Sequence, residues 1–494
     1  MPSNRKKLSL RAAKSMKSTS TGVMPPLLTM PTEMLAAIAE QSDPQLDINP
    51  STDRSQDLLA WRLTCRCISD AVHDNFIKTF FAKRRHLYSI FGLQSLLRIT
   101  AIPHLVQHLQ EIEITVVQAP SDYRQTAYRF QLPGKKEATS TWFEEYTQLN
   151  KFNIGGSLLL GIFKNLKAAN IVPKIAASWR AEAKDDVACY GVPTMLRAFT
   201  PQYGAQITIG QFTEGYANTL ATRLVQAICC SGCPIRTLVL GSNSFHTGLS
   251  NDGFTVDTHH QHPHKLINLE SLHIDLADLI GGWNEELYTG AKRLFSSATA
   301  LERLSIKWQH VDLSRYAGFV EFENDEGNAD SLKWIVPVFA PATGLQILEL
   351  SGVEASVDSF IAILARFKSL QVVKLTNSKI YEGECWSKLF SWMAEAKETQ
   401  WQKVALCDLH RADAALLVQD GENHVPLAHE WKGVEAVRAA IKGLAEAPQY
   451  REPYRYGGEY SGDEADGAEL SDYDDVDFDS YDEHDEEDDE DVEI

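Results

Sequence analysis

A short hydrophobic spacing recurs along the second half of this 494-residue chain, and it limits the possible folds more than any other feature. Three apolar residues stand in the order apolar-x-x-apolar-x-apolar, and successive copies begin 25 to 44 residues apart. Because every second residue of a β-strand points to the same face, each copy predicts a strand with one buried face. Six copies begin at Ile235, Leu269, Leu301, Leu345, Leu370 and Trp401, and an earlier one begins at Leu109.

The segments between these copies have the spacing of amphipathic helices. Phe360, Leu364 and Phe367 share one helical face, with Asp358 placed to cap that helix. Alternating strands and helices predict parallel strands joined by right-handed crossovers. No unit can bury its apolar face alone, so neighbouring units are expected to stack into a solenoid. A doubly wound sheet would show similar alternation, but the recurring spacing and the lack of a Gly-rich phosphate loop favour the solenoid.

The L-x-x-L-x-L spacing resembles the strand of leucine-rich repeats, whose regular units run about 20–29 residues. The longer, uneven intervals predict insertions or longer helices between the strands. We therefore expect an α/β chain in which residues 86–447 form an irregular leucine-rich-repeat-like recognition domain with a parallel sheet. Residues 120–230 do not show the spacing clearly, so the number of units there stays open.

Residues 23–85 have the pattern of a compact helical module. Pro31 suits the first turn of a helix, because its missing N–H would be unsatisfied there in any case. Leu35 and Ile38 follow on one apolar face, and residues 42–57 are polar and contain two prolines, which predicts a loop. A second helix is expected from about Ser55, and a third over residues 68–81.

This module resembles the F-box, most closely that of F-box proteins from filamentous fungi. The resemblance rests on Met30-Pro31-Thr32-Glu33, on Asp57-Leu58-Leu59-Ala60-Trp61-Arg62-Leu63-Thr64-Cys65-Arg66, and on the aromatic residues Phe76, Phe80 and Phe81. The chain departs from the family at Met30, where leucine is usual, at Trp61, and in its longer linker between the first two helices. The resemblance implies a three-helix module that docks on a Skp-type adaptor and, through it, joins a cullin-based ubiquitin ligase.

The apolar side chains of this module are the candidates for the adaptor contact. Helix-in-groove docking is driven by burial of such side chains, and truncating a true anchor costs about 2 kcal/mol or more of binding. Some of them must hold the three helices together instead, and the sequence does not separate the two roles. The residues that the resemblance implies for adaptor binding are Pro31, Leu35, Ile38, Leu58, Leu59, Leu63 and Ile68.

The open face of the predicted sheet would select a protein substrate. With the repeat leucines inside, the alternate residues of each strand face outward, and they are polar and mixed in charge. Such a surface suits a protein or peptide rather than an apolar small molecule. The outward set is Thr237, Val239, His273, Asp275, Arg303, Ser305, Lys307, Glu349, Ser351, Lys374, Thr376 and Lys403, and we expect substrate contact at His273, Asp275, Arg303, Lys307, Glu349 and Lys374.

The negative charge of the chain is concentrated at its C-terminus. The formal net charge is -20, and residues 458–494 hold 20 Asp or Glu and neither Lys nor Arg. Without them the chain has 47 basic and 47 acidic residues. Like charges repel, so we expect residues 448–494 to be a disordered acidic tail that does not bind nucleic acid. Residues 1–22 are basic, acid-free and rich in Ser and Thr, which predicts a disordered arm.

The location expected from the sequence is the cytoplasm, the nucleus or both. The chain has no run of 18 apolar residues and no apolar segment typical of a secretory signal, so no membrane association is expected. Eight cysteines are scattered along it, which favours free thiols in a reducing compartment.

No metal site, cofactor or catalytic activity is expected. Cys230-x2-Cys233 and His260-x3-His264 have spacings found in zinc sites, but about 26 residues separate the pairs, beyond the usual 12–15. Motifs for a nucleophile elbow, a phosphate loop or a metalloprotease are absent. Two alternatives stay open: a repeat scaffold that binds a basic protein through its acidic tail, and a hydrolase or transferase built on an α/β sheet.

Overall fold

The computed structural model describes residues 62–64, 66–117, 148–180, 214–242, 249, 266–277, 285–309, 330, 332–333, 335–381, 384–396, 401–411, 414–420, 423–446 and 449–451. The expected basic arm, the first helix of the N-terminal module and the acidic tail from residue 452 onward lie outside these residues.

A mostly parallel β-sheet runs through the described part of the chain. Strands β1 to β7, β9 and β10 lie side by side in chain order, and each pairs in parallel with the next one on this path. All seven copies of the hydrophobic spacing lie at strands of this sheet, which confirms the predicted parallel α/β architecture. The parallel strands are β1 Lys83–Leu87, β2 Glu111–Val117, β3 Lys174–Arg180, β4 Thr237–Ser242, β5 Ser271–Ala277, β6 Arg303–Gln309, β7 Ile347–Ser351, the short β8 Glu354–Ala355, β9 Val372–Ile380 and β10 Lys403–Arg411.

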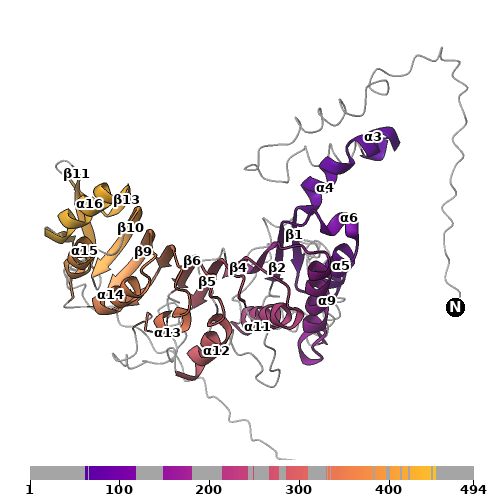
Figure 1. The fold of residues 1–494 in the computed structure, drawn as a ribbon, viewed down its shortest axis with the longest axis horizontal. Coiled ribbons are helices and arrows are strands. Elements are labelled where there is room, and N and C mark those ends of the chain that lie inside the picture. The colour runs from indigo at the N-terminus through magenta and orange to yellow at the C-terminus, as the bar shows by residue number, and fades with distance from the viewer. Residues whose placement is uncertain are drawn as a thin grey trace, which may run out of the picture. The chain divides into compact units, whose positions relative to one another are not determined.

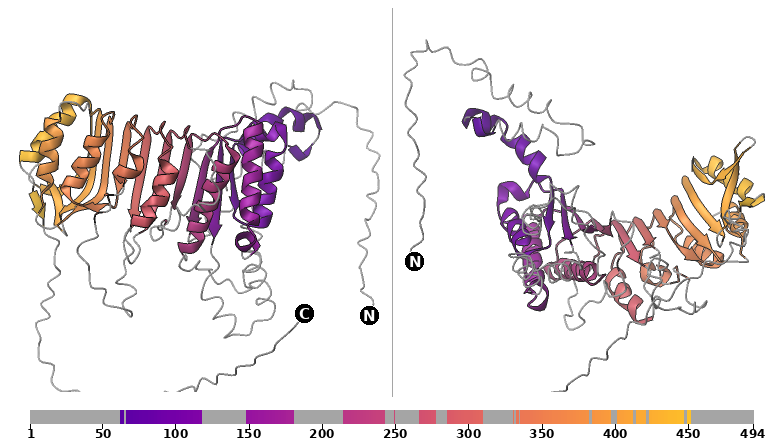
Figure 2. Two further views of the ribbon diagram at one scale, coloured as in Figure 1. Left: turned by 60° about the horizontal axis from the view of Figure 1, so that its bottom comes forward. Right: turned by 180° about the vertical axis from the view of Figure 1, so that it is seen from behind.

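Helices form a layer on one face of this sheet (Figures 1 and 2). Their buried apolar side chains belong to the same hydrophobic cluster as those of the strands. The other face of the sheet carries no helix layer in the described part of the chain. No described helix combines the length and hydrophobicity needed to cross a membrane. The helices of the layer are α5 Ile90–Thr100, α9 Ile154–Ala168, α11 Glu214–Ser231, α12 Glu285–Phe295, α13 Ile335–Phe339, α14 Val357–Arg366, α15 Trp386–Glu395 and α16 Val434–Glu446; the short α6 is Pro103–Val106, and α3 Arg66–Ala71 and α4 His73–Phe81 precede β1.

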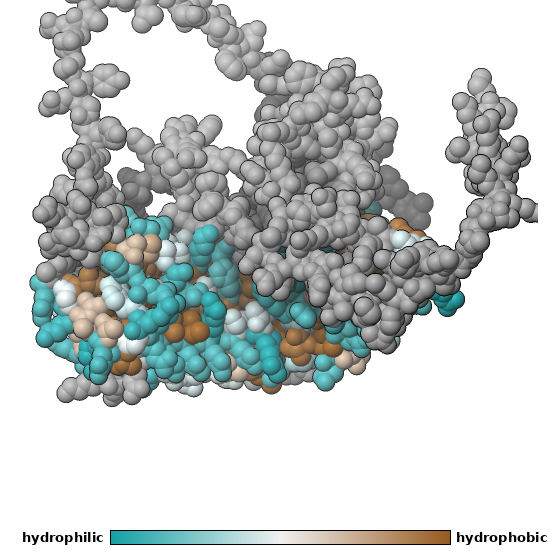
Figure 3. Space-filling model, turned by 90° about the horizontal axis from the view of Figure 1, so that it is seen from above, coloured by the Kyte–Doolittle hydropathy of each residue, from teal (hydrophilic) through white to brown (hydrophobic). Residues whose placement is uncertain are grey.

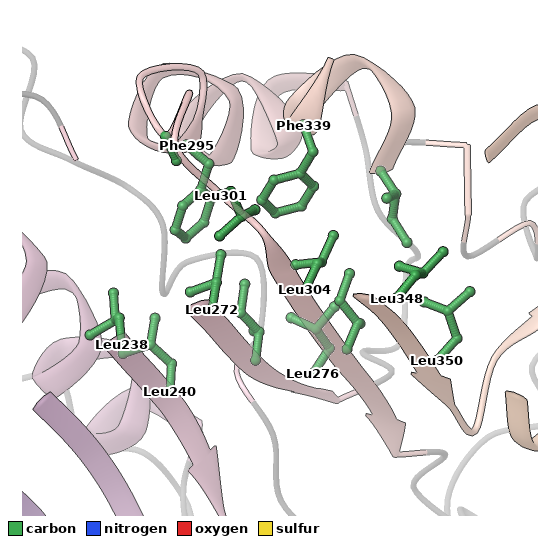
Figure 4. Packing of buried hydrophobic residues seen from close by; sticks show 14 of the residues in the cluster. Leu238, Leu240, Leu272, Leu276, Phe295, Leu301, Leu304, Phe339, Leu348 and Leu350 are labelled. Atoms are coloured by element: carbon green, nitrogen blue, oxygen red, sulfur yellow. The ribbon is translucent and has the colours of Figure 1, made fainter. Parts of the chain in front are cut away.

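One continuous hydrophobic core lies between the strands and the helix layer. The middle leucines of the spacing are register partners on adjacent strands: Leu272 pairs with Leu304, and Leu304 pairs with Leu348. These side chains point toward the helices and are fully buried (Figure 4). The helices contribute rings such as Phe295 and Phe339, whose centroids lie 5.5 Å apart. Burial of this kind contributes roughly 1.5–3 kcal/mol per side chain, so the stacked leucines explain why the units cohere.

Besides the two-residue β8, two parallel strands were not expected from the hydrophobic spacing. β1 is short and basic in sequence, and β3 carries alanine at Ala177, where other strands have a branched apolar residue. Ala177 is nevertheless completely buried. The small side chain is compatible with the close packing of α11 against β3. It also removes the large apolar residue by which the strand could have been predicted.

The C-terminal end of the sheet corrects the prediction of a wholly parallel sheet. β10 pairs antiparallel with β11 and with β13, and β11 pairs antiparallel with β12 and β14. Short connections allow antiparallel pairing, whereas a parallel pair needs a crossover of a dozen or more residues. These strands are β11 Ala414–Asp420, β12 Asn423–Pro426, β13 Ala428–Lys432 and β14 Gln449–Arg451.

The sheet extends beyond both of the boundaries expected from the sequence. β1 covers residues 83–87, so the sheet begins within the segment assigned to the N-terminal module, which was expected to end at 85. β14 covers residues 449–451, inside the segment expected to be tail, and its pairing with β11 makes these three residues part of the sheet.

The N-cap of α14 is Ser356, not the expected Asp358, which lies in the first helical turn. The Ser356 hydroxyl accepts a hydrogen bond from the Ser359 backbone N–H at 3.1 Å, and it also donates one to the Asp330 carboxylate at 3.0 Å. We expect Ser356→Ala to lower the free energy of unfolding by about 1 kcal/mol, because the helix loses its cap. Ser356→Asn, which preserves capping, should lose less in the same urea titration; equal losses would contradict the capping role.

Candidate interaction surfaces

The described end of the N-terminal module contains two of the predicted adaptor-binding residues, and their surroundings differ. Leu63 lies in the helical segment 62–64 and is 85% exposed, whereas Ile68 in α3 is only 6% exposed. Ile68 therefore contributes to packing within the module, and Leu63 is available to a partner. The other predicted residues, Pro31, Leu35, Ile38, Leu58 and Leu59, lie outside the described residues.

The helices around Leu63 are held by apolar and cation–π contacts. A single third helix over 68–81 was expected, but α3 and α4 are separate and meet at Val72, which is buried. The Arg62 guanidinium lies 4.1 Å from the centre of the Phe76 ring, and Phe76 contacts Phe80 with ring centroids 4.6 Å apart. These contacts join segment 62–64 to α4, so that Leu63 is presented from a fixed element.

The six predicted substrate-binding residues lie together on the face of the sheet opposite the helices, here called the open face. His273, Ser305, Glu349 and Lys374 are register partners on β5, β6, β7 and β9, so they form one row across four strands. Asp275 and Lys307 are partners in the next row. Arg303 lies on β6 two residues before Ser305 and therefore on the same face.

Several charged side chains of the open face form ion pairs, either between neighbouring strands or within one strand. The Arg303 guanidinium lies 3.0 Å from a Glu349 carboxylate oxygen. Glu430 on β13 lies 2.9 Å from the Lys403 ammonium and 3.0 Å from that of Lys432. Hydrogen bonds from these two lysines lower the pKa of the Glu430 carboxyl. Surface pairs of this kind contribute about 0–1 kcal/mol each, so they set the charge pattern of the face more than its stability.

The face is predominantly polar. Hydrophilic side chains occupy most of the described surface seen from above, with hydrophobic residues in separated patches (Figure 3). This matches the outward alternation predicted from the sequence and contrasts with the apolar face under the helices.

Asp275 departs from the expectation of an outward-presented carboxylate. It lies on the open face but is only 1% exposed. One carboxylate oxygen, Oδ1, is 2.8 Å from Nε2 of His273, which precedes it by two residues. Gly241 on β4 leaves room for both groups, since a Cβ atom there would stand 3.1 Å from Asp275 Oδ2 and 3.1 Å from His273 Cδ2. The residue at the surface is thus His273, with Asp275 behind it.

A second polar group on the same face was not foreseen. Arg85 on β1 lies 2.7 Å from a Glu113 oxygen, and Ser178 on β3 also donates a hydrogen bond to Glu113. The Thr115 and Ser178 hydroxyls are 2.9 Å apart, and both residues are buried. Sequence reasoning missed this group because β1 and β3 lack the hydrophobic spacing that locates the other strands.

The cysteine part of the possible zinc cluster ends α11 and follows it. Cys229, Cys230 and Cys233 are free thiols. Burial, with a smaller effect of Cys230, raises the pKa of Cys229 to about 12, and burial raises that of Cys233 to about 11. Within the described ranges, no three His, Cys, Asp or Glu side chains gather closely enough to hold a metal ion. His260 and His264 lie outside those ranges.

No protein-family model matches the chain, and no curated protein matches it either.

Proposed function

We propose that this protein is the substrate-recognition subunit of an SCF-type, cullin-based ubiquitin ligase. It binds a Skp-type adaptor through its F-box-like N-terminal module. It binds a protein substrate through the open face of an irregular leucine-rich-repeat domain. Ubiquitin transfer is carried out by other subunits, so the receptor function needs no catalytic residue in this chain.

The exposure of Leu63 is the observation that carries the adaptor half of this proposal. A leucine that is 85% exposed gains nothing from folding, whereas burying it in a partner contributes roughly 1.5–3 kcal/mol. It stands in the stretch Asp57 to Arg66 on which the F-box resemblance rests. Its neighbour Ile68 is buried, as are Val72 and Ile77, so the described helices α3 and α4 bury apolar side chains without Leu63.

The arrangement of the open face supports the substrate half. A parallel sheet with helices on one side leaves a broad second face, and here that face carries paired charges and hydrogen-bonding groups in register across successive strands. Interfaces between proteins have a polar rim around a more apolar centre, and they carry several direct hydrogen bonds, so polar and charged groups of this kind suit the outer part of such an interface. The row from His273 to Lys374 marks its centre.

Leu63→Asp is expected to weaken adaptor binding strongly and leave the fold intact. The full chain is co-purified with a Skp-type adaptor, and affinity is measured by calorimetry. A buried carboxylate would replace an apolar anchor, so we expect at least about 30-fold weaker binding, equivalent to about 2 kcal/mol. The thermal unfolding midpoint should not change, because Leu63 is exposed in the free protein.

Phe152→Asp provides the matched control. Phe152 is also a large exposed apolar residue, at 66%, but it lies just before α9 and outside the N-terminal module. It should keep full adaptor affinity. A folded parent chain that does not bind the adaptor would refute the ligase proposal and leave the repeat scaffold as the leading hypothesis. Equal losses in the two variants would show that binding is not specific to the module.

A further inference from the structure

The strand β13 has one side that no described strand covers, here called the β13 edge. β13 pairs antiparallel with β10 along its other side. It lies with α16 at the C-terminal end of the sheet (Figure 1). Every residue of β13 except Trp431 is exposed. An edge strand of this kind offers its backbone N–H and C=O groups to a further strand.

Hydrogen bonds at the two ends of β13 show which of its backbone groups point to this edge. The N–H of Gly433 and the carbonyl oxygen of Leu427 both bond to the β10 segment, at 2.8 and 2.9 Å. Successive residues of a strand direct their backbone groups to opposite sides. The backbone groups of residues 428, 430 and 432 therefore point to the β13 edge.

The side chains of β13 are complementary to those of a second copy. Glu430 and Lys432 both lie on the open face, and their side chains are 42% and 72% exposed. An antiparallel pair can place Glu430 of one copy opposite Lys432 of the other, and two-fold symmetry then forms the same contact twice. In this register the outward backbone groups of residues 430 and 432 face one another. Trp431 faces Trp431, at a position without direct hydrogen bonds where side chains approach most closely.

We propose that this protein forms a two-fold symmetric dimer in which two β13 edges pair antiparallel. Glu430 and Lys432 of each copy make backbone hydrogen bonds and ion pairs with Lys432 and Glu430 of the other. The Trp431 side chain packs partly against the core, and its ring centroid lies 5.7 Å from that of His429. The two indole rings meet across the symmetry axis and add apolar contact at the centre of the interface.

The helix that follows β13 enlarges this short edge. A stable interface takes about 20–30 residues a side, more than one short strand provides. α16 exposes the short side chains of Ala436 and Ala439 and the backbone of Gly443 along one flank. No atom lies within 4 Å of the position that a Cβ would take at Gly443. This flank leaves room for a second copy to approach closely beside the paired strands.

Sedimentation equilibrium of the full chain tests the dimer. The parent should convert from monomer to dimer between about 1 and 100 µM, as expected for an interface of modest area. Lys432→Glu and Glu430→Lys each place like charges opposite one another twice, so each should weaken self-association at least about tenfold. When the two variants are mixed, every introduced charge faces an opposite one. The mixture should therefore associate with about the parent affinity.

Lys174→Glu is the matched control. Lys174 is an exposed lysine on the open face at β3, and it also pairs with a glutamate, since its ammonium lies 2.8 Å from Glu111. This variant should dimerise like the parent. A parent that stays monomeric over the whole range would overturn the inference, as would a dimer that survives both charge reversals or two variants that do not associate when mixed. Adaptor binding depends on the N-terminal module and is a separate readout.

Discussion

Gly352→Ala is expected to lower the free energy of unfolding by about 3 kcal/mol or more. Gly352 follows β7 and has a φ angle of +68°, a left-handed conformation that residues with a Cβ atom rarely adopt. A Cβ atom there would stand 1.9 Å from the carbonyl oxygen of Trp308 on β6. That oxygen belongs to the backbone of a buried strand, so the strand itself would have to move. Urea-induced unfolding, followed by circular dichroism, measures the loss.

Two other glycines separate the contributions to this loss. Gly433 has a φ of +88°, but no atom lies within 4 Å of its virtual Cβ, so Gly433→Ala should show backbone strain alone, about 1 kcal/mol. Gly344 has neither the positive φ nor a close neighbour, so Gly344→Ala should be neutral or slightly stabilising. If Gly352→Ala lost no more unfolding free energy than Gly433→Ala, β6 would have to move away from the added methyl group without loss of stability.

His86 is expected to make the protein less stable in mild acid. Burial, with a smaller effect of Arg84, lowers the pKa of His86 to about 3, and its Nδ1 lies 3.0 Å from the Gly92 carbonyl oxygen. The unfolded chain binds a proton at this histidine below about pH 6.5, but the folded protein does not until about pH 3. Stability is therefore fully present above pH 6.5 and is lost as the pH falls. We expect a loss of roughly 2 kcal/mol by pH 5 and ~4 kcal/mol by pH 3.5.

His86→Gln tests this dependence, because the glutamine amide can still donate a hydrogen bond to Gly92 but does not titrate. The variant will be less stable at neutral pH, so the comparison is between slopes of unfolding free energy against pH. Between pH 6.5 and 5 the parent should lose about 1.4 kcal/mol per pH unit more than the variant. If the plots of unfolding free energy against pH had the same slope for the two proteins, His86 would be protonated in the folded state or would not cause the acid sensitivity.

The sheet illustrates what local spacing can reveal. Each copy such as Leu301, Leu304 and Ile306 marks a strand, because burial of alternate side chains is a property of the strand itself. β3 was not predicted from the sequence, because its buried position 177 holds the small side chain of Ala177. The antiparallel strands after β10 were not predicted either, because their pairing depends on short turns and not on a repeated unit.

The open face was predictable only in part. His273, Arg303, Lys307, Glu349 and Lys374 lie on the predicted face, and the register places them on adjacent strands. The burial of Asp275 was not predictable, because it results from Gly241 and His273 packing around one carboxylate. In the N-terminal module, the sequence did not distinguish the buried Ile68 from the exposed Leu63.

The amino-acid sequence by itself determined where many of the strands lie, which of their faces is buried, and that successive strands run parallel. These properties follow from a two-residue side-chain period and from the need of each unit to cover its apolar face. Tertiary structure alone decided that Ser305 stands beside His273 and that Gly352 stands against Trp308. Those contacts join residues 32 and 44 positions apart, across connections of unequal length, and only the register of the assembled sheet brings them together.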